Sequence, residues 1–125
     1  MTCRAPDVFL YRFEGHLVTD MFQPSMALVH DALKRHVSVA LLGDGEMWQS
    51  YEPGYRNAWT VWFVRHRRQV REAHLFSPSS IVRMGAQVIN MALATPILHI
   101  HKRRLDFEQA LETVTQPSIG VAPAR

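Results

Sequence analysis

Short apolar runs alternate with segments of helical periodicity along this chain, and this alternation restricts its fold more than any other feature. The runs rich in strand-forming residues predict four strands, at residues 8–13, 37–42, 70–76 and 97–101. Between and after them, apolar residues recur at spacings of three and four, which predicts about four helices. Such alternation with short connections favours a mostly parallel sheet flanked by helices. The sequence therefore predicts an α/β fold with a four- or five-stranded sheet, whose first strand pairs antiparallel at or near one edge.

The second predicted strand gives the most detail about the sheet. Residues 37–42 are almost continuously apolar, which is typical of a strand covered on both faces. Gly43-Asp44-Gly45 follows, and we interpret it as a tight turn out of the sheet, because it lacks the lysine and the third glycine of a phosphate loop. Residues 46–54 are less regular, so a loop is expected after this strand.

Two predicted helices carry the strongest apolar patterns. In the first, six residues share one face: Tyr55, Ala58, Trp59, Trp62, Phe63 and His66. At residues 81–93, by contrast, apolar side chains lie around most of the circumference, which indicates a well-buried helix. An earlier helix is expected at 19–33, with Pro24 near its first turn. A last amphipathic helix is predicted from Asp106 to about Thr115.

Length and composition are those of one ordinary domain. The chain has 125 residues, of which 47% are hydrophobic, and this suffices for a single core. We predict one domain over residues 1–115 and a flexible tail at 116–125, where periodicity is absent. The single cysteine, Cys3, excludes a disulfide within the chain and a cluster of thiolate ligands. No segment resembles a signal peptide or a membrane-spanning helix, so a cytoplasmic protein without membrane insertion is expected.

The net charge of +3 is mildly basic and by itself favours neither nucleic acid nor membrane. Basic residues cluster at 65–71, where a predicted helix ends and its dipole favours cations, and again at 102–104. Such a basic edge could recognise phosphate or an acidic protein. Nucleic acid is not expected as a partner, because Glu72, Asp106 and Glu108 interrupt the basic field and the aromatic residues lie on an inward face.

Motifs of catalysis are absent from the sequence, which has no nucleophile elbow, zinc-protease motif, phosphate loop or dinucleotide-binding glycine pattern. His99 and His101 share one face of a predicted strand, and they would begin a metal site if a third ligand joined them, with His74 the best candidate. The alternative, which we favour, is that these histidines are hydrogen-bonded or solvated. We therefore predict a protein that is not an enzyme and that has neither a metal nor a cofactor.

Aromatic residues are concentrated in one part of the chain. Trp48 and Tyr51 precede the helix that carries Tyr55, Trp59 and Trp62. Helical spacing places most of these rings in the core, but together they have more surface than one face of a sheet readily covers. Because Trp and Tyr are frequent in protein interfaces and in apolar binding sites, the surplus favours one of these two uses.

Several short stretches resemble STAS domains, the fold of anti-sigma-factor antagonists. Residues 8–20 (VFLYRFEGHLVTD) are similar to the strand and G-x-L opening of that family. The strand at 37–42 with Asp44 after it, the helix entry Tyr51-Glu52-Pro53-Gly54 and the segment 107–111 match later parts in order and spacing. The resemblance covers about residues 7–115. More specifically, the chain is similar to the SpoIIAA-like (STAS/SEC14-like) branch, in which an aromatic-rich second helix and a buried third helix recur.

The resemblance implies a non-catalytic signalling or scaffolding module that binds a protein partner through the loop after the second strand and the aromatic second helix. The expected contact residues are Trp48, Ser50, Tyr51 and Tyr55, and a homodimer through the same surface is one form of that interaction. An alternative function is binding of a lipid or other apolar small molecule between the aromatic helix and its neighbour.

The same family implies a phosphorylation switch. In STAS antagonists a partner kinase phosphorylates a serine or threonine of a D-S-S-G-like motif at the start of the second helix. Here Tyr51-Glu52-Pro53-Gly54 occupies that place and offers no serine or threonine. Only a shifted alignment makes Ser50 the acceptor, so Ser50 is the candidate phosphorylation site, against the simpler interpretation of a helix-cap or loop serine.

Overall fold

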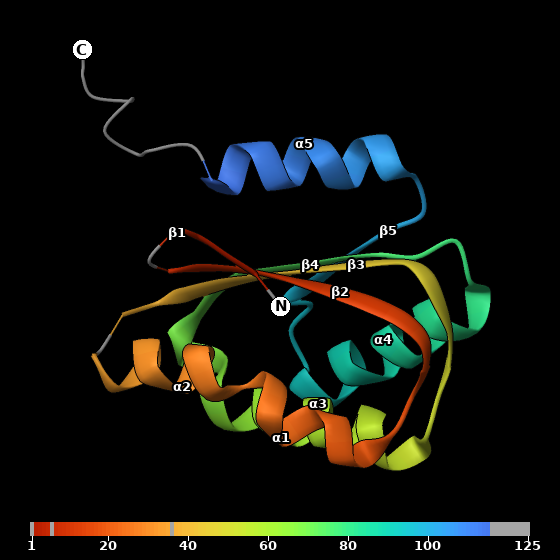
Figure 1. Cartoon of the computed structure of the whole chain (residues 1–125), viewed down its shortest axis with the longest axis horizontal. Coiled ribbons are helices and arrows are strands. Elements are labelled where there is room, and N and C mark those ends of the chain that lie inside the picture. The colour runs from red at the N-terminus through yellow and green to blue at the C-terminus, as the bar shows by residue number, and fades with distance from the viewer. Residues whose placement is uncertain (1, 6, 36, 116–125) are drawn as a thin grey trace.

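Five strands form one sheet in the computed structural model of the protein, which describes residues 2–5, 7–35 and 37–115. The strands are β1 (Thr2–Ala5), β2 (Val8–Leu17), β3 (Val39–Tyr51), β4 (Val70–Phe76) and β5 (Leu98–His101). Their order across the sheet follows their order along the chain (Figure 1). β1 pairs antiparallel with β2, and the other three neighbouring pairs are parallel.

The helices lie on both faces of the sheet, but unequally. Those within the described residues are η1 (Thr19–Met21), α1 (Phe22–Ser25), α2 (Ala27–Lys34), α3 (Pro53–His66), η2 (Arg67–Gln69), α4 (Ser80–Leu93) and α5 (Arg104–Thr115). Because the parallel strands follow one another in sequence order, right-handed crossovers place every connecting helix on the same face. Figure 1 shows α1 to α4 below the sheet and α5 above it. The predicted α/β fold, a mostly parallel sheet flanked by helices, is confirmed.

The antiparallel strand at the edge is not the one that the pattern indicated. Residues 8–13 belong to β2, which runs parallel to β3, with Val8 opposite Ala40. The antiparallel edge strand is β1, which the sequence pattern did not predict. A helical crossover returns the chain in the same direction between β2 and β3, whereas the short connection from β1 to β2 permits a reversal.

The predicted turn and loop after the second strand are wrong, because β3 continues through both, as far as Tyr51. Gly43 and Gly45 lie inside the strand, where they serve close packing. A Cβ atom on Gly43 would lie 2.6 Å from Cε2 of Phe13 in β2, so the missing side chain makes room for the neighbouring ring. Beyond Asp44, β3 pairs only with β2, and Figure 1 shows both strands curving toward the helix layer.

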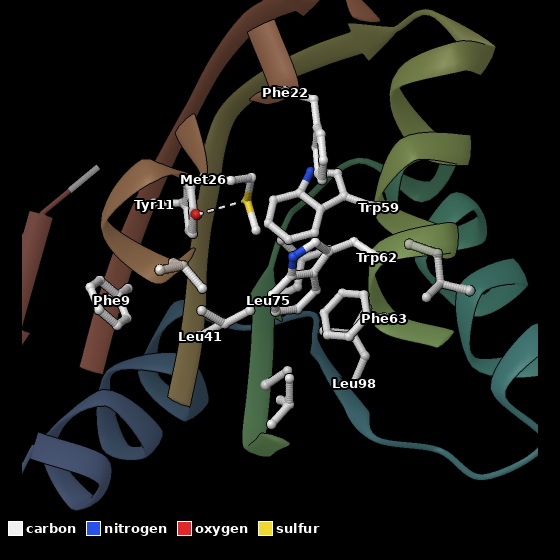
Figure 2. Packing of buried hydrophobic residues seen from close by; sticks show 14 of the residues in the cluster. Phe9, Tyr11, Phe22, Met26, Leu41, Trp59, Trp62, Phe63, Leu75 and Leu98 are labelled. Atoms are coloured by element: carbon white, nitrogen blue, oxygen red, sulfur yellow. Dashed lines mark hydrogen bonds between the residues drawn. The ribbon is translucent and has the colours of Figure 1, made fainter. Parts of the chain in front are cut away.

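Two hydrophobic clusters lie on the two faces of the sheet. The larger one lies between the sheet and the helices α1 to α4, and Figure 2 shows its aromatic and aliphatic side chains packed together. The smaller one lies under α5 and contains Val8, Leu10, Ala40, Leu42, Phe76, Phe107 and Val114. Every residue of β3 from Val39 to Gly45 is buried, so the predicted cover on both faces is confirmed. The predicted flexible tail, residues 116–125, lies outside the described residues.

The helix α4 is buried on one side only, and the prediction of burial all around it is wrong. Its inner face, with Val82, Gly85, Ala86, Ile89 and Leu93, packs on the sheet and on α3. Its outer face exposes Ile81 by 62%, Met84 by 67%, Val88 by 42% and Met91 by 78%. Since the helix layer is one helix thick, an apolar outer face has no cover within the described part of the chain.

Candidate functional site

The predicted contact residues Trp48, Tyr51 and Tyr55 come together at the junction of β3 and α3. The Trp48 ring centroid lies 5.9 Å from that of Tyr51 and 6.2 Å from that of Tyr55. However, Tyr55 is only 3% exposed, and Trp48 and Tyr51 are half-buried against the larger core. These rings therefore pack largely inward, and their role in binding a protein partner stays a prediction.

A pocket lies beside these rings, between the sheet and the helices α3 and α4; we call it the α3–α4 pocket. Trp48, Tyr51 and Tyr55 line it together with residues of all three elements, among them Phe13, Leu75, Trp59, Phe63, Ala86 and Ile89. Its wall is almost entirely apolar, and the centre of a water molecule can reach about 70 Å³ of it. The arrangement suits a small apolar molecule.

Aromatic contacts hold the rings of this wall in fixed orientations. The Phe13 and Trp48 centroids are 4.5 Å apart, and the Tyr11 ring meets Trp59 edge-on at 5.4 Å. Trp48 Nε1 donates a hydrogen bond to the Ser50 carbonyl oxygen at 2.9 Å. Because offset and edge-on ring pairs are favourable, the wall is preorganised in the absence of a ligand.

Tyr51 and Gly85 bring β3 and α4 close together. A Cβ atom on Gly85 would collide with the Tyr51 hydroxyl oxygen, so only glycine lets the phenol ring lie against the helix. The single glycine within an otherwise apolar helical pattern was the sequence signal for this contact. Tyr51, the last residue of β3, therefore packs its ring against α4 in the wall of the pocket.

Two polar groups lie among the apolar ones. Burial raises the pKa of Tyr55 to about 12, and the neighbouring Trp59 indole N–H partly opposes this effect. Trp59 Nε1 is itself buried and makes no hydrogen bond of good geometry within the described residues.

Ser50, the candidate phosphorylation site, lies on β3 and is half-buried. Its Oγ is 2.6 Å from Nδ1 of His16 in β2. It precedes Pro53, the first residue of α3, by three positions and does not cap that helix. Its phosphorylation stays a prediction.

The histidines that were considered as metal ligands contact one another. His74 Nδ1 lies 3.0 Å from His101 Nε2, and His74 Nε2 lies 3.0 Å from a Glu72 carboxylate oxygen. His99 stacks on His74, with the centroids 4.9 Å apart. Burial, and next the charge of His74, lowers the pKa of His101. Within the described residues, no group of three or more His, Cys, Asp or Glu side chains is placed to hold a metal ion.

An ion-pair network that the sequence did not suggest ties α5 to the sheet. Arg104 donates to both carboxylate oxygens of Asp44, at 3.0 and 3.3 Å, and also pairs with Glu46 and Glu108. Burial alone would raise the pKa of Asp44, but hydrogen bonds from Arg104 and from the Glu46 N–H outweigh burial and lower that pKa. Thus Arg104 of the basic cluster at 102–104 has a structural partner in the sheet, and Arg103 pairs with Asp106 within α5 and its entry.

A second hollow, the α2–α3 groove, is wider and more polar. It lies between α2 and α3, and its lining includes His30, Lys34, Trp62, Arg65 and His66. Trp62 Nε1 donates to His30 Nε2 at 3.2 Å. Lys34, Arg65 and His66 are in the last turns of their helices, where the helix dipole stabilises cations, so this groove has an ordinary structural explanation.

None of the helices described is both long enough and apolar enough to span a membrane. Comparisons of this chain with models of protein families, with curated proteins and with solved structures find no match. The resemblance to STAS domains therefore stays a prediction from the sequence.

Proposed function

We propose that this domain binds a small apolar molecule in the α3–α4 pocket and performs no chemistry on it. The observation that carries the proposal is the wall of the pocket, which is apolar and built from aromatic rings of the sheet and of α3. Ligand sites in proteins are typically concave and apolar, with few polar groups that orient the ligand.

The unfilled space in the pocket favours ligand binding. Atoms that line a void lack dispersion partners on one side, and a ligand restores these contacts. The rings already hold their orientations through mutual contacts, so little conformational freedom is lost on binding. Both effects favour a compact apolar molecule.

The position of the predicted contact residues favours a small molecule over a protein partner at this site. Tyr55 is buried, and Trp48 and Tyr51 pack on the core, so little of their surface is available to a protein. Within this proposal the domain acts in the cytoplasm as a non-catalytic signalling module. A bound molecule would press on Tyr51 and change the surface near Ser50, which a signalling partner could recognise.

The test is a titration with octanol, followed by proton–nitrogen correlation NMR of the three indole N–H groups. Trp48 and Trp59 line the pocket, so their signals should shift in a saturable manner. The Trp62 N–H, bonded to His30 in the α2–α3 groove, should move far less. An absence of saturable shifts at Trp48 and Trp59 would reject the proposal.

A pair of leucine variants on α4 sharpens this test. Ala86→Leu fills the pocket from its wall and should abolish the shifts. Gln87→Leu adds the same side chain at the next, exposed position and should leave them unchanged. Octanol binding to the Ala86→Leu protein with wild-type affinity would place the ligand elsewhere.

A second candidate function, association with a second copy of the chain, is favoured by the outer face of α4. Ile81, Met84, Val88 and Met91 form an exposed apolar stripe without an acidic or basic residue in it. In a dimer with a two-fold axis, the stripe of one copy contacts the stripe of the other. Because the stripe has no charged residue, this contact brings no like charges together. The stripe also has no charge that would attract a charged partner. Exposed apolar patches of this kind are typical of interaction sites.

Sedimentation measurements at micromolar concentration test this candidate. The wild type should sediment as a dimer, and Met84→Lys should give a monomer, because the two-fold axis would bring two lysines together. Met47→Lys is the control, since Met47 is 61% exposed and belongs to β3, not to α4. A monomeric wild type, or a dimeric Met84→Lys protein, would rule the stripe out as the interface.

A further inference from the structure

Arg56 differs from every other residue that lines the α3–α4 pocket, because it is the one with a permanent charge. It is half-buried, so part of its side chain is covered by the protein and part is exposed to solvent. Neither Asp nor Glu lines the pocket among the described residues. The described lining of the pocket therefore includes a cationic residue and no anionic one.

The stability of α3 does not account for this arginine. Arg56 is in the first turn of the helix, which begins at Pro53. The helix dipole is positive at that end and disfavours cations there. Arg65 and His66, at the other end of the same helix, are placed where the dipole favours them. The α3 dipole therefore disfavours the positive charge of Arg56 at this position.

The carboxylate that precedes Arg56 by one helical turn has another partner. Glu52, four residues earlier, accepts hydrogen bonds from the Thr19 backbone N–H at 2.8 Å and from Thr19 Oγ1 at 3.0 Å. The ion pairs of arginines in the described part of the chain involve Arg71, Arg103 and Arg104. Arg56 has no ion pair among those residues, and its guanidinium is available to an anion.

We propose that the molecule bound in the α3–α4 pocket is an amphipathic acid, whose apolar part lies among the rings and whose carboxylate pairs with Arg56 at the mouth. This inference rests on the proposed function, because it names the chemical class of the same ligand. The guanidinium group binds a carboxylate through two parallel hydrogen bonds, which fixes the ligand's direction. The positive end of the α3 dipole adds to the attraction.

The size of the pocket limits the apolar part of the acid. About 70 Å³ is open to water centres, and the rings around it leave a narrow space. A short acyl chain or a single ring fits such a space, whereas a long-chain lipid would extend into solvent. The acid is therefore short.

The experiment compares octanoate with octanol, which share the apolar chain and differ in the carboxylate. Both are titrated into the full chain, and the indole signals of Trp48 and Trp59 report pocket binding. Arg56→Met removes the charge and retains most of the aliphatic stem. It should weaken octanoate binding about tenfold, the size typical of a lost charge-assisted hydrogen bond, and leave octanol binding unchanged. Arg65→Met makes the same change at the other end of α3 and should alter neither affinity.

The outcomes separate this inference from the proposed function. If octanol binds and octanoate does not, or if Arg56→Met weakens the binding of both equally, the ligand is not an acid. The proposal that the pocket binds an apolar molecule then still holds. If Arg65→Met weakens octanoate as much as Arg56→Met does, only the general charge of the protein attracts the acid, and the inference fails. If neither compound shifts the two indole signals, both proposals fail. The NMR spectrum of each variant shows whether it is folded.

Discussion

Among the described residues, the helices α1 to α4 cover one face of the sheet, and α5 covers the other. On the first face, 23 buried residues form the larger cluster, with the rings of Tyr11, Phe13, Trp59 and Trp62 among them. On the second face, seven buried residues, mostly aliphatic, form the smaller cluster. The Arg104–Asp44 ion pair also joins α5 to the sheet on this face. The pocket lies on the first face.

The contrast has a physical cause. Aliphatic side chains interdigitate and fill small spaces, whereas large flat rings meet edge-on or at an offset and adapt less well to one another. A narrow layer such as the one under α5 is filled by a few aliphatic residues and two phenylalanines. A wide layer built from rings retains a gap, and that gap is the α3–α4 pocket.

The largest expected difference between the faces concerns ring truncation. Trp59→Ala should lower the free energy of unfolding by about 4 kcal/mol, since Trp59 packs against five other rings. Phe107→Ala, on the α5 face, should cost about 3 kcal/mol, because Phe76 is its nearest ring partner. Urea unfolding measures both. A loss below about 1 kcal/mol for Trp59→Ala would contradict its place in the core.

The next effect concerns the Arg104–Asp44 ion pair, which joins α5 to the sheet. Arg104→Met should destabilise the protein by about 2 kcal/mol, because it leaves the buried Asp44 carboxylate without its main donor. Arg103→Met is the matched control: its ion pair with Asp106 is exposed, and its loss should cost far less than the loss of the Arg104 pair. Equal losses of stability in the two variants would mean that the Arg104–Asp44 pair does not stabilise the protein more than an exposed ion pair does.

The smallest effect is on pH dependence, where the two faces should behave alike. Burial is the first cause that lowers the pKa of His101 beside α5 and of His30 beside α3, below the ordinary value of 6.5. The unfolded chain then binds protons that the folded protein does not, so the free energy of unfolding falls as the pH drops below about 6.5. His101→Gln should reduce this fall between about pH 7.5 and about pH 5.5, and so should His30→Gln.

The wild type is the reference for that comparison. If the His101 and His30 variants retain its full pH dependence, their burial has no effect on stability. A change in only one of them would show that the two faces differ in this property as well.

The periodicity of the sequence predicted which α3 residues are buried, and it failed where packing decides the structure. Tyr55, Trp59, Trp62 and Phe63 share a face in the sequence and are buried in the fold. Gly43 and Gly45 were interpreted as a turn, because glycine in a sequence does not distinguish a turn from a strand that makes room for Phe13. The ring pocket was predicted only as an alternative, since no local pattern shows which way Trp48 and Tyr51 point.

The sequence alone determined the alternation of strands and helices, the parallel sheet and the inward face of α3, because these depend on periodicities within short segments. The tertiary structure decided that α1 to α4 share one face, that α4 is exposed on its outer side, and that Arg56 lines an apolar pocket. These features depend on strand order and on contacts between distant segments. No local pattern specifies such contacts.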